Sequence, residues 1–355
     1  MIRFDSKMKK RVKIAGIVIG VLVVIGLISF AALVGSCLSF DETGAHVKDR
    51  FGILAMESGK QPEQTDDGQT EQQPAESEAP TDGDQDTAVP AVHALFASAE
   101  RMANDEEYMA EIESAGRSGA ADQVVTEFKD VDGRVSFRLE SSVVSGVWSG
   151  FAKWFKFALE EADTAGLETY AMLHCFHDSK AVESDPSIAV HTADGGLWTD
   201  ADGSYWLDPT DEDVQDYLIE LVEQSVEAGA KEIILRDFVF PSADAALTYD
   251  EQDGSRAEQL MQLYSKLQRA AGEVPVSIWL DDPTADSETT GQDIKKMYRN
   301  AYRLYAPAAD TAEAQQLAEQ IAAKAGGSAH FVPVFEQSES YDILPGGAVC
   351  GLTEE

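Results

Sequence analysis

Short runs of apolar residues alternate with amphipathic stretches along the chain after Pro90. Each apolar run has the length and the β-branched or aromatic content of a strand, and the stretches between them carry apolar residues at helical spacing. The predicted strands span residues 91–98, 122–128, 168–176, 231–238, 274–280, 301–307, 329–335 and 348–354. A regular alternation of strands and helices indicates parallel strands joined by crossover helices.

Helices fill most of the gaps and are clearest over residues 211–228, 256–271 and 311–325. In the first of these, Val214, Leu218 and Leu221 fall on one face, behind a start marked by Asp208 and Pro209. Eight strand-helix units over residues 91–355 match an α/β fold of the (β/α)8 TIM-barrel type. The eighth strand lies near the C-terminus, so its closing helix is expected to be missing or supplied by another segment. A doubly wound open sheet is the competing architecture, but no Gly-x-Gly-x-x-Gly follows the first strand.

The N-terminus has the pattern of a membrane anchor. Residues 1–13 carry six Lys or Arg residues, and the 21 residues from Ile14 to Val34 contain no charge, which is enough for one transmembrane helix. We predict a signal anchor over residues 14–36 in the lipid bilayer, with the basic flank cytoplasmic and the remainder extracytoplasmic. A cleaved signal peptide is the rival interpretation, although its apolar region is usually shorter. The stretch LVGSC resembles a lipoprotein cleavage box, so anchorage through a lipid on Cys37 is a second alternative.

Residues 37–90 form the predicted extracytoplasmic linker, and from about residue 57 they are acidic and almost free of large apolar side chains. Such a segment cannot bury enough surface to fold, and it is expected to be a disordered, self-repelling spacer before the domain at 91–355. The formal charge of the whole chain is -37, which argues against nucleic acid as a partner because phosphates would be repelled.

The three cysteines, Cys37, Cys175 and Cys350, do not form a disulfide framework. Cys175 lies within the apolar run AMLHCF and is expected to be a buried small hydrophobe rather than a nucleophile. A bridge between Cys175 and Cys350 stays open, because a domain outside the cell would be in an oxidising compartment.

Two stretches carry a resemblance to a known family. They are ADQVVTEFKDVDGRVSFRLES (residues 121–141) and GGLWTDADGSYWLDPTDEDVQDYLIELVEQSVEAGAKEI (residues 195–233), the latter followed closely by FPS. They resemble a bacterial family of glycoside-hydrolase-like domains with a TIM-barrel fold, distantly similar to the alpha-amylase superfamily. The resemblance covers roughly residues 91–355, and it implies the barrel fold and a carbohydrate substrate.

One departure from the family falls on the predicted fourth strand, KEIILRDF. The family more usually reads E-I-Q-F-D-Y-x-R-F-P there, which puts its carboxylate at the position of Arg236 and leaves Asp237 one residue later. Neighbouring residues of a strand point to opposite faces. Whether Arg236 or Asp237 faces the cleft is therefore an open question of register.

In a (β/α)8 barrel the reactive groups sit at the C-terminal ends of the strands. The polar residues at those ends are Glu127, Lys129, Asp130, His174, His177, Asp178, Arg236, Asp237, Asp281, Asp282 and Glu336. Glycoside hydrolysis generally needs two carboxyl groups, one as proton donor and one as nucleophile or base. By the resemblance, Asp237 would be the nucleophile, Asp281 or Asp282 the acid, and Glu336 a further carboxylate. Glu127 is a fourth catalytic candidate, because it shares an expected face with Lys129.

The substrate-binding candidates are polar or aromatic groups around the same strand ends and the long loop after the third strand, whose rings suit the C–H faces of sugars. They are Lys129, Asp130, His174, Trp198, Trp206, Asp208 and Arg236. No metal site is predicted, because the two histidines are isolated and residues 200–203 lack the remaining ligands of a calcium loop. No cofactor is expected.

Each candidate also has a structural interpretation. Arg236 and Asp237 could be a rim ion pair, Asp281 and Asp282 could open a turn, and the tryptophans could pack the loop onto the barrel. Two hypotheses for function stay open: a membrane-tethered glycoside hydrolase or transglycosylase acting on peptidoglycan or another polysaccharide, and a barrel without catalysis that binds glycan or scaffolds envelope proteins. A non-glycan hydrolase is a third. The sugar, the linkage and the oligomeric state are not determined by the sequence.

Overall fold

A computed structural model describes residues 38–41, 44–47, 89–243, 246–249, 254–285, 287–337 and 340–352. The chain divides into two compact units, Met1–Gly83 and Asp84–Glu355. In the first unit, β1 (Leu38–Asp41) pairs antiparallel with β2 (Gly44–Val47).

The predicted membrane anchor at residues 14–36 and nearly all of the predicted acidic spacer lie outside the described residues. Within the part of the chain that is described, no helix combines the length and the apolar character needed to cross a bilayer.

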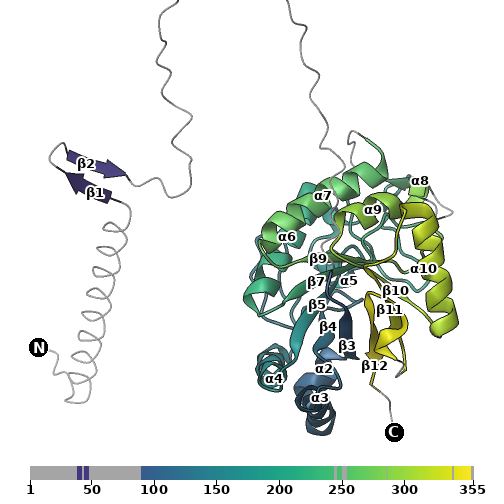
Figure 1. Cartoon of the computed structure of the whole chain (residues 1–355). Coiled ribbons are helices and arrows are strands. Elements are labelled where there is room, and N and C mark those ends of the chain that lie inside the picture. Colours follow the sequence, from purple (N-terminus) through teal and green to yellow (C-terminus); the bar gives the residue numbers. More distant parts are fainter. Residues whose placement is uncertain are drawn as a thin grey trace, which may run out of the picture. The chain divides into compact units, whose positions relative to one another are not determined.

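The second unit is built on a closed barrel of eight parallel strands (Figure 1). The strands are β3 (Val92–Ala97), β4 (Gln123–Lys129), β5 (Glu168–His174), β7 (Glu232–Arg236), β9 (Val276–Trp279), β10 (Leu304–Pro307), β11 (Phe331–Phe335) and β12 (Gly347–Gly351). The ring closes where β12 pairs in parallel with β3, with Val349 opposite Ala94. All eight predicted strands are present, and the barrel that the pattern predicted is confirmed.

Helices connect successive strands and surround the barrel (Figure 1). They are α2 (Ala99–Asn104), α3 (Glu106–Ser118), α4 (Ala152–Thr164), α5 (Ser179–Ser184), α6 (Glu212–Glu227), α7 (Arg256–Ala271), α8 (Ser287–Thr290), α9 (Ile294–Asn300) and α10 (Thr311–Ala325), with short 3-10 turns η2 (Pro186–Ile188) and η3 (Tyr341–Ile343). The strands β6 (His191–Thr192) and β8 (Leu247–Thr248) pair between two loops.

Local sequence explains where the main helices begin. The Asp211 side chain accepts a hydrogen bond from the backbone N–H of Val214 and so caps α6. At α7, Ser255 and Glu258 form a reciprocal capping box. The face of α6 that carries Leu218 and Leu221 is buried, as the apolar spacing predicts.

The strands separate two hydrophobic clusters. The larger one lies between strands and helices, and the smaller one fills the barrel interior. The interior cluster consists of Val92, Ala94, Val125, Tyr170, Met172, Ile234, Trp279, Tyr305, Val332, Val334 and Val349. Because side chains alternate along a strand, these residues identify which positions face inward.

Both described cysteines, Cys175 and Cys350, are buried, and no disulfide joins them, so the bridge that the sequence left open is absent. Burial raises the pKa of Cys175, which keeps it protonated and unreactive.

A buried ionic network closes the base of the barrel. Glu232, at the start of β7, forms an ion pair with Arg303 and accepts hydrogen bonds from Ser277 (2.6 Å) and from the Tyr305 hydroxyl (2.8 Å). Arg303 also donates to the carbonyl of Pro90 (2.7 Å), just before the first barrel strand. Burial opposes the charge on Arg303, but Glu232 outweighs it and holds the pKa of the guanidinium above its usual range.

We expect Glu232→Gln to destabilise the protein by about 3 to 5 kcal/mol, because it leaves the Arg303 charge buried without its partner. Urea unfolding measures the change. The control is Lys180→Gln, which breaks an exposed pair with Glu183 and should cost no more than about 1 kcal/mol. Equal stabilities of the two variants would contradict the role given to the network.

Candidate active site

The polar groups of the candidate site continue the interior faces of the strands to the C-terminal mouth of the barrel. Each stands two residues after a member of the interior cluster, so strand alternation turns it inward. They are Glu127 of β4, His174 of β5, Arg236 of β7 and Asp281 just after β9.

The backbone at Asp237 departs from strand geometry. Its φ is +49°, in the left-handed region, and it is the one non-glycine residue with positive φ among the described residues. Such a conformation costs about 1 to 3 kcal/mol and is most accessible to Asp and Asn. The turn at this residue brings its side chain toward the mouth beside that of Arg236, although a regular strand would turn them to opposite faces.

The contacts of the two neighbours show that both reach the mouth. The Arg236 guanidinium lies 4.6 Å from the centroid of the Trp279 ring and donates to Oδ1 of Asp281, at 3.1 Å from Nε. Asp237 Oδ2 lies 2.5 Å from Nδ1 of His174. Arg236 and Asp237 therefore both lie at the mouth of the barrel, although they are neighbours in the sequence.

His174 is held between two carboxylates and is only 3% exposed. Its Nδ1 contacts Asp237 at 2.5 Å, and its Nε2 lies 3.5 Å from Oε1 of Glu127. Burial alone lowers the pKa of His174, but the bonds and charges of the two carboxylates outweigh it and raise that pKa above its ordinary value. Burial likewise raises the pKa of Asp237, but His174 and Arg236 outweigh it and lower that pKa. The site therefore favours an imidazolium beside a carboxylate.

The pKa of Asp281 is shifted in the opposite direction from that of Asp237. Burial raises the pKa of its carboxyl group, and the neighbouring Asp237 carboxylate, with which it shares a hydrogen bond, raises it further against the opposing charge of Arg236. Two adjacent carboxyl groups whose pKa values are pushed apart are the pattern expected of an acid and its partner base. The next residue, Asp282, bonds the backbone N–H and hydroxyl of Thr284, so it forms the turn that the sequence allowed.

The aromatic loop forms a wall next to Asp237. The Trp206 ring stacks on His177 with centroids 5.0 Å apart, and its Nε1 donates to Oδ2 of Asp200 at 3.0 Å. The His177 ring lies 3.8 Å from Asp237 Oδ2 on one side and 3.2 Å from Asp200 Oδ2 on the other. The ring centroids of Trp198 and Trp206 are 6.4 Å apart. Both predicted tryptophans are therefore part of the loop that borders the site.

Glu127 and Asp130 also line a cleft of about 300 Å³ at this end of the barrel, together with Arg134. Asp130 accepts a hydrogen bond from the Arg134 backbone N–H at 2.7 Å, and burial raises the pKa of its carboxyl group. The lining of this cleft extends from Glu127 to Phe151, the residue that precedes α4.

The structure corrects the expectation that Lys129 binds substrate. Its ammonium group is completely buried, pairs with Asp178 at 2.9 Å and donates to the carbonyls of His174 and Cys175. These contacts use its three donors within the protein. The expected shared face with Glu127 is also wrong, because an irregularity of the β4–β5 register falls between residues 127 and 129.

Two further candidates lie apart from the carboxylate cluster. Asp208 is buried and accepts hydrogen bonds from the backbone N–H (2.8 Å) and hydroxyl (2.6 Å) of Thr210, which gives it a structural contact. Glu336 is exposed just beyond β11, and within the described residues it makes no side-chain hydrogen bond or ion pair with the cluster.

Sequence reasoning missed Trp279 and gave too little weight to His177 and Asp200. Trp279 faces the interior two residues before Asp281, so alternation from the strand end could have identified it. No sequence signal pairs His177 with Asp200, because the loop geometry brings them together. Among the described residues, no group of three or more His, Cys, Asp or Glu side chains is arranged to hold a metal ion.

Comparison with known proteins agrees with the barrel fold. Residues 94–305 match the model of the DUF4015 family, described as "Putative glycosyl hydrolase domain". The chain belongs to this family. The family resemblance inferred from the two sequence stretches is thereby confirmed, and the domain is glycoside-hydrolase-like. A comparison with curated proteins gives no match.

Solved structures are similar to this family member. A family 36 alpha-galactosidase from Geobacillus stearothermophilus, in complex with stachyose, is 11% identical with a TM-score of 0.51, and the match covers 74% of this chain and 39% of the galactosidase. A hypothetical protein from Ruminiclostridium thermocellum is 23% identical with a TM-score of 0.48, over 52% of this chain and 96% of the other. The galactosidase is a larger protein, and the likeness concerns the barrel fold.

The charged pair at the mouth should give this glycosyl hydrolase-like domain a defined pH dependence of stability. The raised pKa of His174 contributes stability that is complete below its ordinary value of 6.5 and is lost as the pH rises through the raised value. The lowered pKa of Asp237 contributes stability above its ordinary value of 3.8 that is lost as the pH falls through the lowered value. The pair therefore stabilises most between about pH 4 and 6.5.

Urea unfolding of the wild type and of Asp237→Asn from pH 3 to 9 measures this contribution. Asn is accepted in the left-handed conformation, so the variant removes the charge and keeps the backbone. The stability difference should be largest in that window and shrink on both sides. A difference that does not vary with pH would show that the pair is not ionised as described. Asp282→Asn, in an exposed turn, serves as control.

Proposed function

We propose that the protein is a glycoside hydrolase in which Asp237 and Asp281 carry the reaction. The single observation that supports this most strongly is the contact of two carboxyl groups at the barrel mouth whose pKa values are shifted in opposite directions. The protonated Asp281 would donate to the glycosidic oxygen as the bond to the anomeric carbon breaks. The ionised Asp237 would attack that carbon or take a proton from the attacking water.

The spacing of the carboxyl groups limits how this can occur. Retaining enzymes separate theirs by about 5 to 5.5 Å and inverting enzymes by about 6.5 to 9.5 Å, and Asp237 is close enough to Asp281 to raise the pKa of its carboxyl group. A glycosidic oxygen that entered beside Asp281 would take the place of Asp237 as its neighbour.

Glu127 is the second candidate for the acid. It and Asp237 lie on opposite nitrogens of His174, at 3.5 and 2.5 Å, so the two carboxylates are at most about 8 Å apart. That distance fits the known mechanisms without rearrangement. His174 would then hold both groups in place, and Arg236 would contact hydroxyl or acidic groups of the sugar.

We propose a polysaccharide as the substrate, with cell-envelope glycan such as peptidoglycan included. The motivation is the extracytoplasmic position that the N-terminal sequence predicts, together with the aromatic wall of Trp198, Trp206 and His177 beside Asp237. Aromatic faces bind the C–H faces of sugar rings, and the polar groups around them take the hydroxyls.

A second candidate function is glycan binding without hydrolysis. Arg236 stands where the resembled family carries its carboxylate, and its guanidinium donates a hydrogen bond to Asp281, the proposed acid. Polysaccharide binding with no turnover of any glycoside would favour this alternative.

The kinetics of three variants on glycosides with a poor and an activated leaving group test the mechanism. Asp237→Asn should lower kcat/KM by about 10² to 10⁴ on both substrates, because the nucleophile or base acts on each. Asp281→Asn should lose a similar factor on an alkyl glycoside but much less on a dinitrophenyl glycoside, which needs no proton donor. If Glu127→Gln shows that selective loss instead, Glu127 is the acid.

Asp282→Asn is the matched control, because its carboxylate is adjacent in sequence but bound within the exposed turn with Thr284. It should retain wild-type rates. If Asp237→Asn turned over substrate as fast as the wild type, the proposed mechanism would be ruled out.

We also propose that the hydrolase is tethered to the membrane through residues 14–34. Deletion of residues 1–36 should move the protein from the membrane fraction to the soluble fraction, since it removes the apolar run. Alkaline carbonate should not extract the wild type. Release by Cys37→Ser alone would identify a lipid anchor at Cys37 instead of a spanning helix.

A further inference from the structure

A second concave surface lies outside the barrel, between α4 and α6. It is an open groove of about 720 Å³, and its lining includes Arg138, Trp148, Lys153, Lys156, Phe157 and Gln224. The groove has a link to the candidate active site, because Ser149 and Gly150 line both this groove and the cleft that contains Glu127. A long ligand could therefore occupy the mouth and the groove together.

Exposed aromatic rings concentrate around α4. Within the described residues, five large hydrophobic side chains are exposed, and three of them are Trp148 (46%), Trp154 (53%) and Phe157 (45%). Trp148 and Phe157 line the groove between α4 and α6. Rings left in water at a concave surface are a marker of a binding site rather than of the core.

The same groove gathers positive charge on a strongly acidic protein. Arg138 lies 5.9 Å from the centroid of the Trp148 ring, and Lys153 lies 4.9 Å from that of the Trp154 ring. Arg138, Lys153 and Lys156 make no ion pair with any described residue, and these three cations outnumber the two carboxylates of the lining, Glu160 and Glu227. Because the whole chain has a formal charge of -37, an anion would be attracted only where cations are locally in excess.

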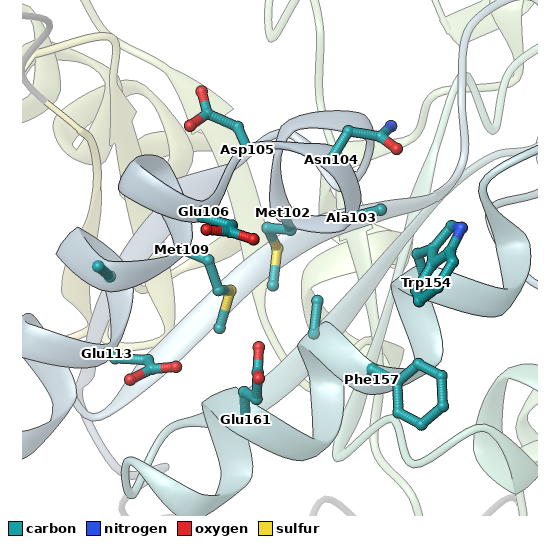
Figure 2. A pocket seen from close by; sticks show the side chains of 12 residues that line it. Met102, Ala103, Asn104, Asp105, Glu106, Met109, Glu113, Trp154, Phe157 and Glu161 are labelled. Atoms are coloured by element: carbon teal, nitrogen blue, oxygen red, sulfur yellow. The ribbon is translucent and has the colours of Figure 1, made fainter.

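The opposite side of α4 has the reverse character. A groove of about 610 Å³ lies there between α2, α3 and α4, and Figure 2 shows carboxylate side chains around it together with Trp154 and Phe157. Its charged lining consists of Asp105, Glu106, Glu113 and Glu161, with no cation. The helix thus separates a groove that would repel an anion from one that could accept it.

We propose that the groove between α4 and α6 binds an acidic polysaccharide, with sugar rings stacked on Trp148 and Phe157 and acidic groups beside Arg138, Lys153 and Lys156. The assignment to a glycan rests on the proposed function, because Ser149 and Gly150 line both the groove and the cleft that contains Glu127. It narrows the substrate to a polymer that carries negative charge and is held some distance from the reacting bond.

Binding of the full chain to polygalacturonate and to hyaluronate tests the proposal, with methyl-esterified polygalacturonate as the neutral form of the same backbone. Affinity electrophoresis or calorimetry gives the dissociation constants. The wild type should bind at least one acidic polymer, more weakly as salt is raised. Lys153→Gln/Lys156→Gln and Trp148→Ala should each weaken binding by about tenfold, the effect of losing about 1.4 kcal/mol.

The matched control removes two positive charges from another helix. Lys295 and Arg299 are exposed on α9, and Lys295→Gln/Arg299→Gln changes the net charge as the lysine double variant does. It should bind within about twofold of the wild type if local rather than net charge decides binding. Equal weakening of both double variants, equal binding of the esterified polymer, or no binding of either acidic polymer would overturn the proposal.

The binding assay separates this inference from the proposed catalysis. Asp237→Asn should bind the acidic polymer as the wild type does, because the carboxylate lies at the mouth and not in the groove. Loss of turnover by Asp237→Asn with unchanged binding supports both proposals. Normal hydrolysis with unchanged binding by the groove variants would support the proposed hydrolase and rule out the groove as the binding site of the acidic polymer.

Discussion

Alternation of side chains along the strands of a closed barrel is the constraint on which this structure depends. The interior accepts one residue in two from each strand, and apolar side chains fill it between the ionic network at the base and the C-terminal end. The polar groups of the candidate site therefore lie at the last inward position of their strands. Glu127, His174, Arg236 and Asp281 all occupy such positions, which is why residues far apart in the sequence form one cluster.

Electrostatic interactions within the cluster then shift the pKa values of several of its titratable groups. Three carboxyl groups would repel one another in a partly buried site, but His174 and Arg236 stand between them. Burial raises the pKa of both carboxyl groups, but His174 and Arg236 outweigh it at Asp237 and lower that pKa, while the neighbouring Asp237 adds to the raised pKa of Asp281. Two chemically identical side chains thus differ in pKa because their surroundings differ.

Much of this architecture can be predicted from the sequence, because strands and amphipathic helices follow from local patterns. The predicted helices 256–271 and 311–325 agree with α7 and α10 to the residue, and every barrel strand is found. The candidate carboxylates Glu127, Asp237 and Asp281 are brought together, as their places at the strand ends suggested.

The sequence-based predictions fail where the backbone departs from regular strand geometry. The irregularity between residues 127 and 129 turns Lys129 away from the mouth and into the layer between strands and helices, where it forms a buried ion pair with Asp178. A strict alternation of side chains does not predict this position. The left-handed turn at Asp237 lets two neighbours share one face. Both are local choices of φ and ψ, made by tertiary contacts, and a single sequence carries little information about them.

The positive φ of Asp237 has a consequence for how related sequences are compared. A column-by-column alignment with the family pattern finds an arginine where a carboxylate is customary, and such a chain would be counted among the inactive members. In space, however, the backbone turn returns a carboxylate to the mouth from the following column. During divergence a carboxylate can thus move by one position along the chain while keeping its place in the fold, so inventories based on aligned columns would miss it.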